Sequence, residues 1–218
     1  VTLEQVRGDE EVGVFIDYAN RYLRVLGYTE HSPRHAARVA ETARAILLEA
    51  DYPERVAELA AIAGYLHDIG NVIHREGHAQ SGSLITLRVL SRLGMPPDEC
   101  AVVANAIGNH EEERGYATTP VSAALDIADK ADVHRSRVQA DSFQNFDIHD
   151  RVNYATTQSE VLVDTPGKVI SLELTIDTSF AQVIEYFEIF LDRMVMVKQA
   201  AEFLGFHFRL VINGTVFS

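Results

Sequence analysis

The sequence predicts a mainly α-helical protein with a small C-terminal α+β extension. Over the first 150 of its 218 residues, apolar side chains recur at three- and four-residue steps, which is the period of an α-helix. The pattern then changes, because residues 168–176 and 206–213 alternate between apolar and polar side chains as half-buried strands do. We therefore expect a helical domain over residues 1–150 and a strand–helix–strand unit over residues 151–218.

The first two long helices have clear limits in the sequence. Residues 11–26 carry one apolar face, and Gly27 ends it. Ser32 followed by Pro33 is typical of a helix N-cap with proline at the first helical position. The second helix therefore starts there and runs to about Ala50.

The third helix is expected at the centre of the domain. It starts at Pro53, is apolar on most sides, and ends at His67-Asp68-Ile69-Gly70; a helix that is apolar all round is a buried one. Further helices are expected at residues 78–93, 97–109 and 120–139, because glycine and proline interrupt the chain between them.

The extension is expected to hold a small sheet. The strand at 168–176 has a hairpin partner at 160–163, across a turn at 164–167. A long helix capped by Ser179 and the strand at 206–213 follow, and Asn213-Gly214 has the composition of a turn. So few elements make a thin core. We therefore expect this unit to pack on the helical domain or on a second subunit and to contribute no metal ligand.

Composition and charge limit the partners. The chain has 32 Asp and Glu against 19 Lys and Arg, a net charge of −13, which repels nucleic-acid polymers and anionic membranes. Its single cysteine, Cys100, excludes an internal disulfide and fits a reducing compartment. Without a basic-then-apolar leader or a long apolar run, the sequence predicts a cytoplasmic protein.

The doublet His67-Asp68 is the centre of the candidate site. A charge at the end of a buried helix is costly unless it is paired or bound to a metal, and an ordinary hydrogen-bonded His–Asp pair accounts for the doublet equally well. Further candidate ligands stand at the ends or inner faces of neighbouring helices: His35, His78, His110 and Asp129. Histidine and carboxylate without thiolate suit zinc, iron, manganese, nickel or cobalt.

In order and in local wording, these residues resemble the HD-domain metal-dependent phosphohydrolases. His67-Asp68-Ile69-Gly70 matches the commonest form of the family's doublet, His78 is followed four residues later by Gly82, and Ala128-Asp129-Lys130 resembles the family's final motif. The resemblance covers roughly residues 30–140 and implies an HD-type helical bundle.

The intermediate histidines resemble the two-metal branch of that family. The resemblance implies two divalent transition ions, with one set of ligands for each: His35, His67, Asp68 and Asp129 for the first, and Asp68 as a bridge with His78 and His110 for the second. Asp68 and His110 are the implied catalytic residues. Asn71 and Asn109 stand where relatives that hydrolyse cyclic dinucleotides have lysine and a second histidine, which argues against such substrates.

The implied activity is hydrolysis of a small phosphate ester or nucleotide by a metal-bound hydroxide, as a phosphomonoesterase or phosphodiesterase. Two alternatives are a two-iron oxygenase on the same scaffold and a non-catalytic regulatory module that binds a metal or nucleotide. A small phosphorylated substrate is the expected partner, and a homo-oligomer is a further expectation.

Several side chains have two interpretations. Arg38, Arg75 and Lys130 are candidates for contact with the substrate phosphate, although each equally fits an ordinary surface ion pair. His74 could replace His78 as a ligand, and Glu111 could act as a base or support a ligand. The other histidines are expected to be surface or hydrogen-bonded residues: His31, His134, His149 and His207.

Overall fold

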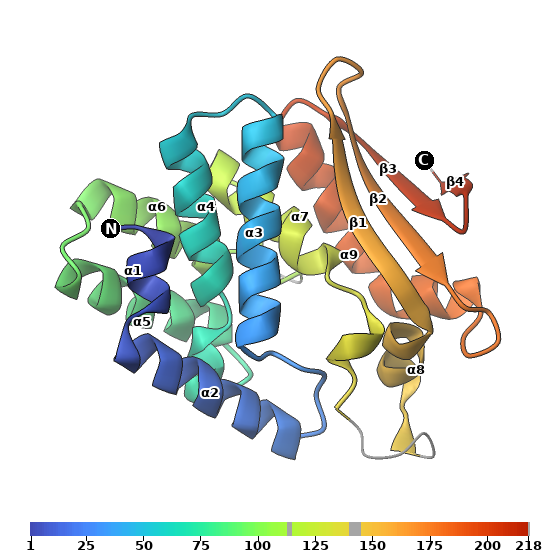
Figure 1. Ribbon diagram of the computed structural model, residues 1–218, viewed down its shortest axis with the longest axis horizontal. Coiled ribbons are helices and arrows are strands. Elements are labelled where there is room, and N and C mark those ends of the chain that lie inside the picture. Colours follow the sequence, from blue (N-terminus) through green and yellow to red (C-terminus); the bar gives the residue numbers. More distant parts are fainter. Residues whose placement is uncertain (113–114, 140–144, 218) are drawn as a thin grey trace.

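A computed structural model describes residues 1–112, 115–139 and 145–217 and shows a helical bundle joined to a small sheet (Figure 1). The bundle contains α1 (Leu3–Arg7), α2 (Glu10–Val25), α3 (Pro33–Glu49), α4 (Glu54–Leu66), η1 (Ile69–Val72), α5 (His78–Arg92), α6 (Pro97–Gly108), α7 (Pro120–Ala131) and η2 (Arg135–Arg137). The rest contains α8 (Ile148–Ala155), β1 (Thr156–Asp164), β2 (Val169–Ile176), α9 (Val183–Phe203), β3 (His207–Ile212) and β4 (Thr215–Phe217). The predicted fold class is confirmed.

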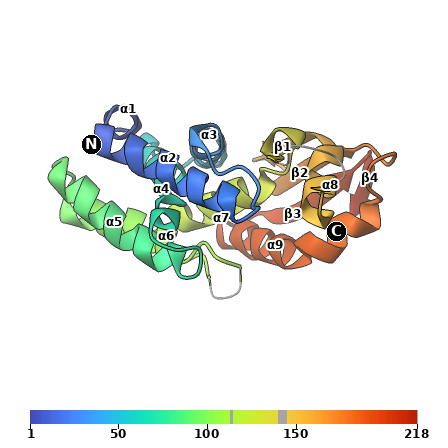
Figure 2. The ribbon, with the colours of Figure 1, turned by 90° about the horizontal axis from the view of Figure 1, so that it is seen from below.

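The buried helix α4 is the centre of the bundle, as its composition predicts. Every residue from Leu59 to Leu66 is buried. A Cβ added to Gly64 would lie 2.9 Å from the Cα atom of Ala40, so α3 and α4 pack with their backbones almost in contact. Helix α7 packs against α3, α4 and α6 on one side and against α9 on the other (Figure 2). α7 therefore joins the bundle to the C-terminal part.

Two predicted helix limits are wrong for local reasons. The helix expected at 120–139 ends at Ala131, where Asp132 leaves the helical conformation with ψ 68° and directs its side chain to His35. Ser179 does not cap a helix, because it donates to the Asp177 carboxylate in a turn, and α9 begins only at Val183. In addition, the short helix α1 was not expected.

The four strands form one sheet in the order β1-β2-β3-β4. β1 and β2 make the predicted antiparallel hairpin, and β2 pairs in parallel with β3 after the crossover through α9. The turn at Asn213-Gly214 has φ angles of 51° and 78°, as a two-residue hairpin loop requires, and it leads into β4. The sheet is thus one strand longer at this edge than expected.

The C-terminal part contacts the bundle through α8, α9 and β1. α9 packs on α7, and β1 runs beside α3 (Figure 1). The expected domain boundary at residue 150 falls inside α8, which leads directly into β1. Among the helices of the described residues, none is long and apolar enough to cross a membrane.

Candidate metal centre

The six candidate ligands come from consecutive elements of the bundle and meet in its interior. His35 lies in the first turn of α3, His67 and Asp68 follow α4, and His78 is the first residue of α5. His110 follows α6, and Asp129 lies in the last turn of α7. All four histidines are only 1–2% exposed. The fold therefore brings together every residue that the sequence nominated as a ligand.

Two glycines allow this convergence. A Cβ on Gly70 would lie 2.0 Å from the carbonyl oxygen of His78, which no side chain permits. Gly82 faces the same place, with its own Cβ position 3.2 Å from the Gly70 nitrogen. The backbones after Asp68 and after His78 therefore touch. This is the physical reason for the two glycines in the motifs.

One half of the cluster contains His35, His67 and Asp129. The Nε2 atoms of His35 and His67 lie 3.3 Å apart, and Asp129 Oδ1 lies 3.5 Å and 3.4 Å from them. Asp68 Oδ2 completes this half at 3.1 Å from His67 Nε2. A small cation among these atoms would have two imidazole and two carboxylate ligands.

The other half contains His78 and His110. Their Nε2 atoms lie 3.2 Å apart, and Asp68 Oδ1 lies 3.3 Å from His78 Nε2. Asp68 thus directs one oxygen at each half of the cluster. Asn71 donates to Asp68 Oδ1 at 2.9 Å and fixes that orientation.

The outward ring nitrogen of each histidine is held by an oxygen. The Nδ1 partners are Asp132 Oδ2 at 2.6 Å for His35, the Gly64 carbonyl at 2.8 Å for His67, the Arg75 carbonyl at 3.0 Å for His78 and the Ile107 carbonyl at 2.7 Å for His110. A carbonyl only accepts, so Nδ1 carries the hydrogen and Nε2 of a neutral ring is bare. Facing bare nitrogens repel each other, and a cation between them removes that repulsion. The donor set therefore fits divalent metal.

The charges of the cluster point the same way. Burial lowers the pKa of His67, but Asp68 and Asp129 outweigh it and raise that pKa to about 10. Burial, followed by Lys130 and the neighbouring rings, lowers the pKa of His110 to about 3. Without metal, the first half thus attracts a positive charge, and His110 stays a neutral ligand.

Basic side chains line the space beside the ligands. Lys130 Nζ lies 2.7 Å from Asp129 Oδ2 and 3.2 Å from Glu112 Oε1, and Arg75 Nη1 lies 3.9 Å from Asp68 Oδ1. Arg193 of α9 also lines this space, as does Arg137. Two of the three nominated phosphate contacts, Arg75 and Lys130, therefore border the cluster.

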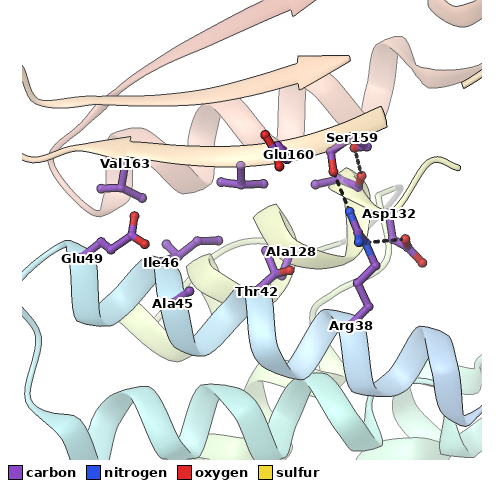
Figure 3. Close-up of a pocket in the computed structure, with 12 residues that line it drawn as sticks. Arg38, Thr42, Ala45, Ile46, Glu49, Ala128, Asp132, Ser159, Glu160 and Val163 are labelled. Atoms are coloured by element: carbon purple, nitrogen blue, oxygen red, sulfur yellow. Dashed lines mark hydrogen bonds and ion pairs between the residues drawn. The ribbon is translucent and has the colours of Figure 1, made fainter. Parts of the chain in front are cut away.

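Arg38, the third nominee, lies elsewhere. Its guanidinium lies between α3 and β1, where Nη2 donates to the Ser159 carbonyl at 2.6 Å and Nε lies 3.0 Å from Asp132 Oδ1 (Figure 3). Arg38 and Asp132 line a cavity between α3 and β1, which shares no lining residue with the space beside the ligands. Arg38 thus connects the sheet to the residue that orients a ligand.

The structure also shows residues that sequence reasoning missed. His31, expected to be a surface or hydrogen-bonded residue, is half-buried; its Nδ1 contacts the Thr29 carbonyl at 2.7 Å, and its Nε2 lies 3.8 Å from Asp68 Oδ2. Its position four residues before His35 was a usable signal. Asp132, one turn after Asp129, was another, whereas nothing in the sequence places Arg193 here.

The remaining alternatives are resolved by position. His74 is exposed and accepts from the Glu76 backbone, whereas His78 lies in the cluster. Glu111 Oε1 lies 3.0 Å from His78 Nδ1, beside the Arg75 carbonyl that contacts the same nitrogen. His149 and His207 are exposed, as expected, and the half-buried ring of His134 contacts Ser136.

The bundle and its cluster define an α-helical domain that is built to hold divalent metal through imidazole and carboxylate groups. Residues 34–134 match the family model of the HD domain, and this range contains all six ligands. This part of the chain is therefore an HD domain, a type of domain typical of metal-dependent hydrolases, and the resemblance seen in the sequence is confirmed. No curated protein is similar enough to count as a relative.

Proposed function

We propose that this protein is a phosphohydrolase that acts on a small phosphate ester or nucleotide with two divalent ions. The supporting observation is the orientation of the Asp68 carboxylate. Its Oδ2 atom lies 3.1 Å from His67 Nε2 and its Oδ1 atom lies 3.3 Å from His78 Nε2, so one oxygen faces each half of the cluster. His35, His67, Asp68 and Asp129 would hold one ion, and Asp68, His78 and His110 the other. Bound there, the ions would polarise the phosphoryl group and activate water for attack.

The chain's own residues support this chemistry in two ways. Asn71 and the Nδ1 partners hold the ligands in fixed orientations before any substrate arrives. Arg75 and Arg193 supply positive charge beside the ligands, where the phosphate oxygens would lie. The net charge of −13 favours a small substrate over a polymer. A reducing cytoplasm, in which the buried Cys100 stays a free thiol, is part of this proposal.

The proposal is tested on the full chain after anaerobic reconstitution with manganese, iron, zinc, nickel or cobalt. Metal per chain is measured together with hydrolysis of phenyl phosphate and a mononucleotide panel. We expect two ions and turnover in the wild type. Asp68→Asn should abolish turnover and weaken both ions, whereas His78→Ala should lower the occupancy of one ion.

Asp17→Asn, on the exposed face of α2, is the matched control and should leave both readouts unchanged. Turnover by a metal-loaded Asp68→Asn preparation would refute the mechanism. Binding of no more than one ion under all conditions would refute the two-ion arrangement. Oxygen-dependent absorption without phosphate release would favour the two-iron oxygenase instead.

A further inference from the structure

We infer that the C-terminal part forms one wall of the substrate cavity. In this cavity Arg193 binds the phosphate of the substrate, and Asp150 binds hydroxyl or amino groups at the other end of the same molecule. This inference rests on the proposed phosphohydrolase function and names the substrate class. It assigns specificity to residues outside the range that matches the HD domain.

The cavity adjoins the metal ligands. It has a volume of about 340 Å³ and lies between the turn after α2 and the helices α8 and α9. Four residues line both this cavity and the space at the ligands, so the two adjoin: His31, Arg75, Arg137 and Arg193. The volume is at the lower end of the range for small-molecule sites, which suits a single compact phosphate ester.

Two arginines, one from each part of the chain, are held in place at this junction. Arg75 lies over the ring of Tyr28 at 5.4 Å, and Arg193 lies over the ring of Phe190 at 4.5 Å. The Nε atom of Arg193 is 3.0 Å from Glu112 Oε1, which fixes the side chain. Among the residues that the structure describes, no carboxylate pairs with its two terminal amino groups. Arginines stacked on aromatic rings lose less freedom when they bind phosphate. We therefore place the phosphate between them and the metal ligands.

Asp150 supplies the opposite chemistry at the far end. It lies in the first turn of α8, is only 7% exposed and lines the cavity. Within the described residues, no side chain donates a hydrogen bond to its carboxylate, and no cation lies within ion-pair distance. The carboxylate therefore keeps accepting capacity toward the cavity, and a ligand that brings a hydroxyl or ammonium group would form a charge-assisted hydrogen bond there.

The position of Asp150 is fixed on both sides. Arg151, the next residue, pairs with Glu185 at 2.9 Å and holds α8 on α9. Asn153 Oδ1 accepts from the His134 backbone at 3.3 Å and holds α8 on the end of the HD domain. The carboxylate thus has a set position relative to the arginines. A phosphate ester with a donor group at its other end matches both.

The test is calorimetric binding to the metal-loaded full chain, with hydrolysis recorded separately. The probes are inorganic phosphate, phenyl phosphate without a donor, ribose 5-phosphate with hydroxyls and O-phosphoethanolamine with an ammonium group. We expect the wild type to prefer at least one donor-bearing ester over phenyl phosphate by tenfold or more. The preferred probe tells whether the donor is hydroxyl or ammonium.

Asp150→Asn should reduce that preference to within twofold. Arg193→Gln should raise the Kd of every probe, inorganic phosphate included, by tenfold or more. Asp98→Asn is the control for an acidic residue in the first turn of a helix. Arg88→Gln is the control for an arginine that lies over a phenylalanine and pairs with a glutamate. Both controls should keep the wild-type constants.

The outcomes separate this inference from the proposed function. Equal binding of all esters by the wild type, or an unchanged preference in Asp150→Asn, would overturn the inference even if the protein hydrolyses phosphate esters. Selective binding that depends on Asp150 and Arg193, without hydrolysis under any metal, would instead overturn the proposed function and keep the binding site.

Discussion

Replacing Asp132 by asparagine should lower the affinity for the ion at His35 and His67 and leave the affinity for the other ion unchanged. The Asp132 carboxylate receives the His35 Nδ1 hydrogen bond at 2.6 Å, and both side chains are 1% exposed. Arg38 and Arg137 lie 3.0 Å and 3.8 Å from its oxygens. The substitution keeps the shape of the side chain, removes its charge and replaces one of its two accepting oxygens by an amino group.

The magnitude follows from that change of charge. Burial raises the pKa of Asp132, but His35 and Arg137 hold it well below its ordinary value, so the group is ionised at neutral pH. A hydrogen bond to a charged group is stronger than a neutral one by about 1 to 2 kcal/mol. Since 1.4 kcal/mol is tenfold, the metal Kd should rise roughly 5- to 30-fold. This range overlaps the losses typical when the partner of a ligating histidine is removed.

The assay is chelator competition, which gives a Kd for each ion separately. Glu111→Gln is the matched variant, because Glu111 Oε1 lies 3.0 Å from His78 Nδ1 in the other half of the cluster. We expect Asp132→Asn to weaken the first ion and Glu111→Gln the second. The thermal midpoint of metal-free protein reports any loss of folding separately. Equal weakening of both ions by each variant, or no weakening by either, would refute the assignment of separate halves.

Three further changes test other parts of the structure. Gly70→Ala should displace His78, lower the occupancy of one ion and destabilise the fold by more than about 3 kcal/mol in urea unfolding. Gly13→Ala, whose added Cβ would meet no atom within 4 Å, should stabilise the fold by about 0.5–1 kcal/mol in the same measurement. Burial raises the pKa of Asp126 well above its ordinary value, and neither oxygen has a partner within the described residues, so stability is lost as the pH rises through the folded pKa. Asp126→Asn should thus gain about 1–3 kcal/mol over wild type between pH 5 and 8 in urea unfolding, and a constant difference would contradict this. Arg38→Gln should cost about 1–2 kcal/mol and leave the KM for phenyl phosphate unchanged; a higher KM at unchanged stability would instead support phosphate contact.

The sequence predicts well which side chains the fold brings together in the candidate metal site, because metal chemistry restricts both residue type and spacing. A histidine in the first turn of a helix, a His-Asp doublet after one and a glycine four residues beyond His78 are local patterns. Their meeting requires only that consecutive helices pack side by side, as helices joined by short loops do. Gly70 and Gly82 carry the remaining information, since they mark where two backbones touch.

The residues that orient ligands and face the cavity are harder to predict, because their roles depend on packing between distant segments. The continuation of α7 past Ala131 looked helical from the sequence, yet the chain turns there because Asp132 bonds His35. His31 stands four residues before His35, but its approach to Asp68 depends on how distant segments pack. The spacing of Arg38 from His35 fits a contact with phosphate, but its guanidinium donates to the Ser159 carbonyl of β1 instead.

The division of the chain explains why motifs identify a reaction class here and not a substrate. Every motif lies in the part that matches the HD domain, a type of domain typical of metal-dependent hydrolases, and all six candidate ligands lie there too. The cavity beside them is completed by α8 and α9, which lie outside that range, and we infer that their side chains select the substrate. Arg193 reaches the ligands only because α9 packs on α7, the helix that carries Asp129. A change of substrate in a related chain should therefore alter α8 and α9 first and leave the histidines and Asp68 in place.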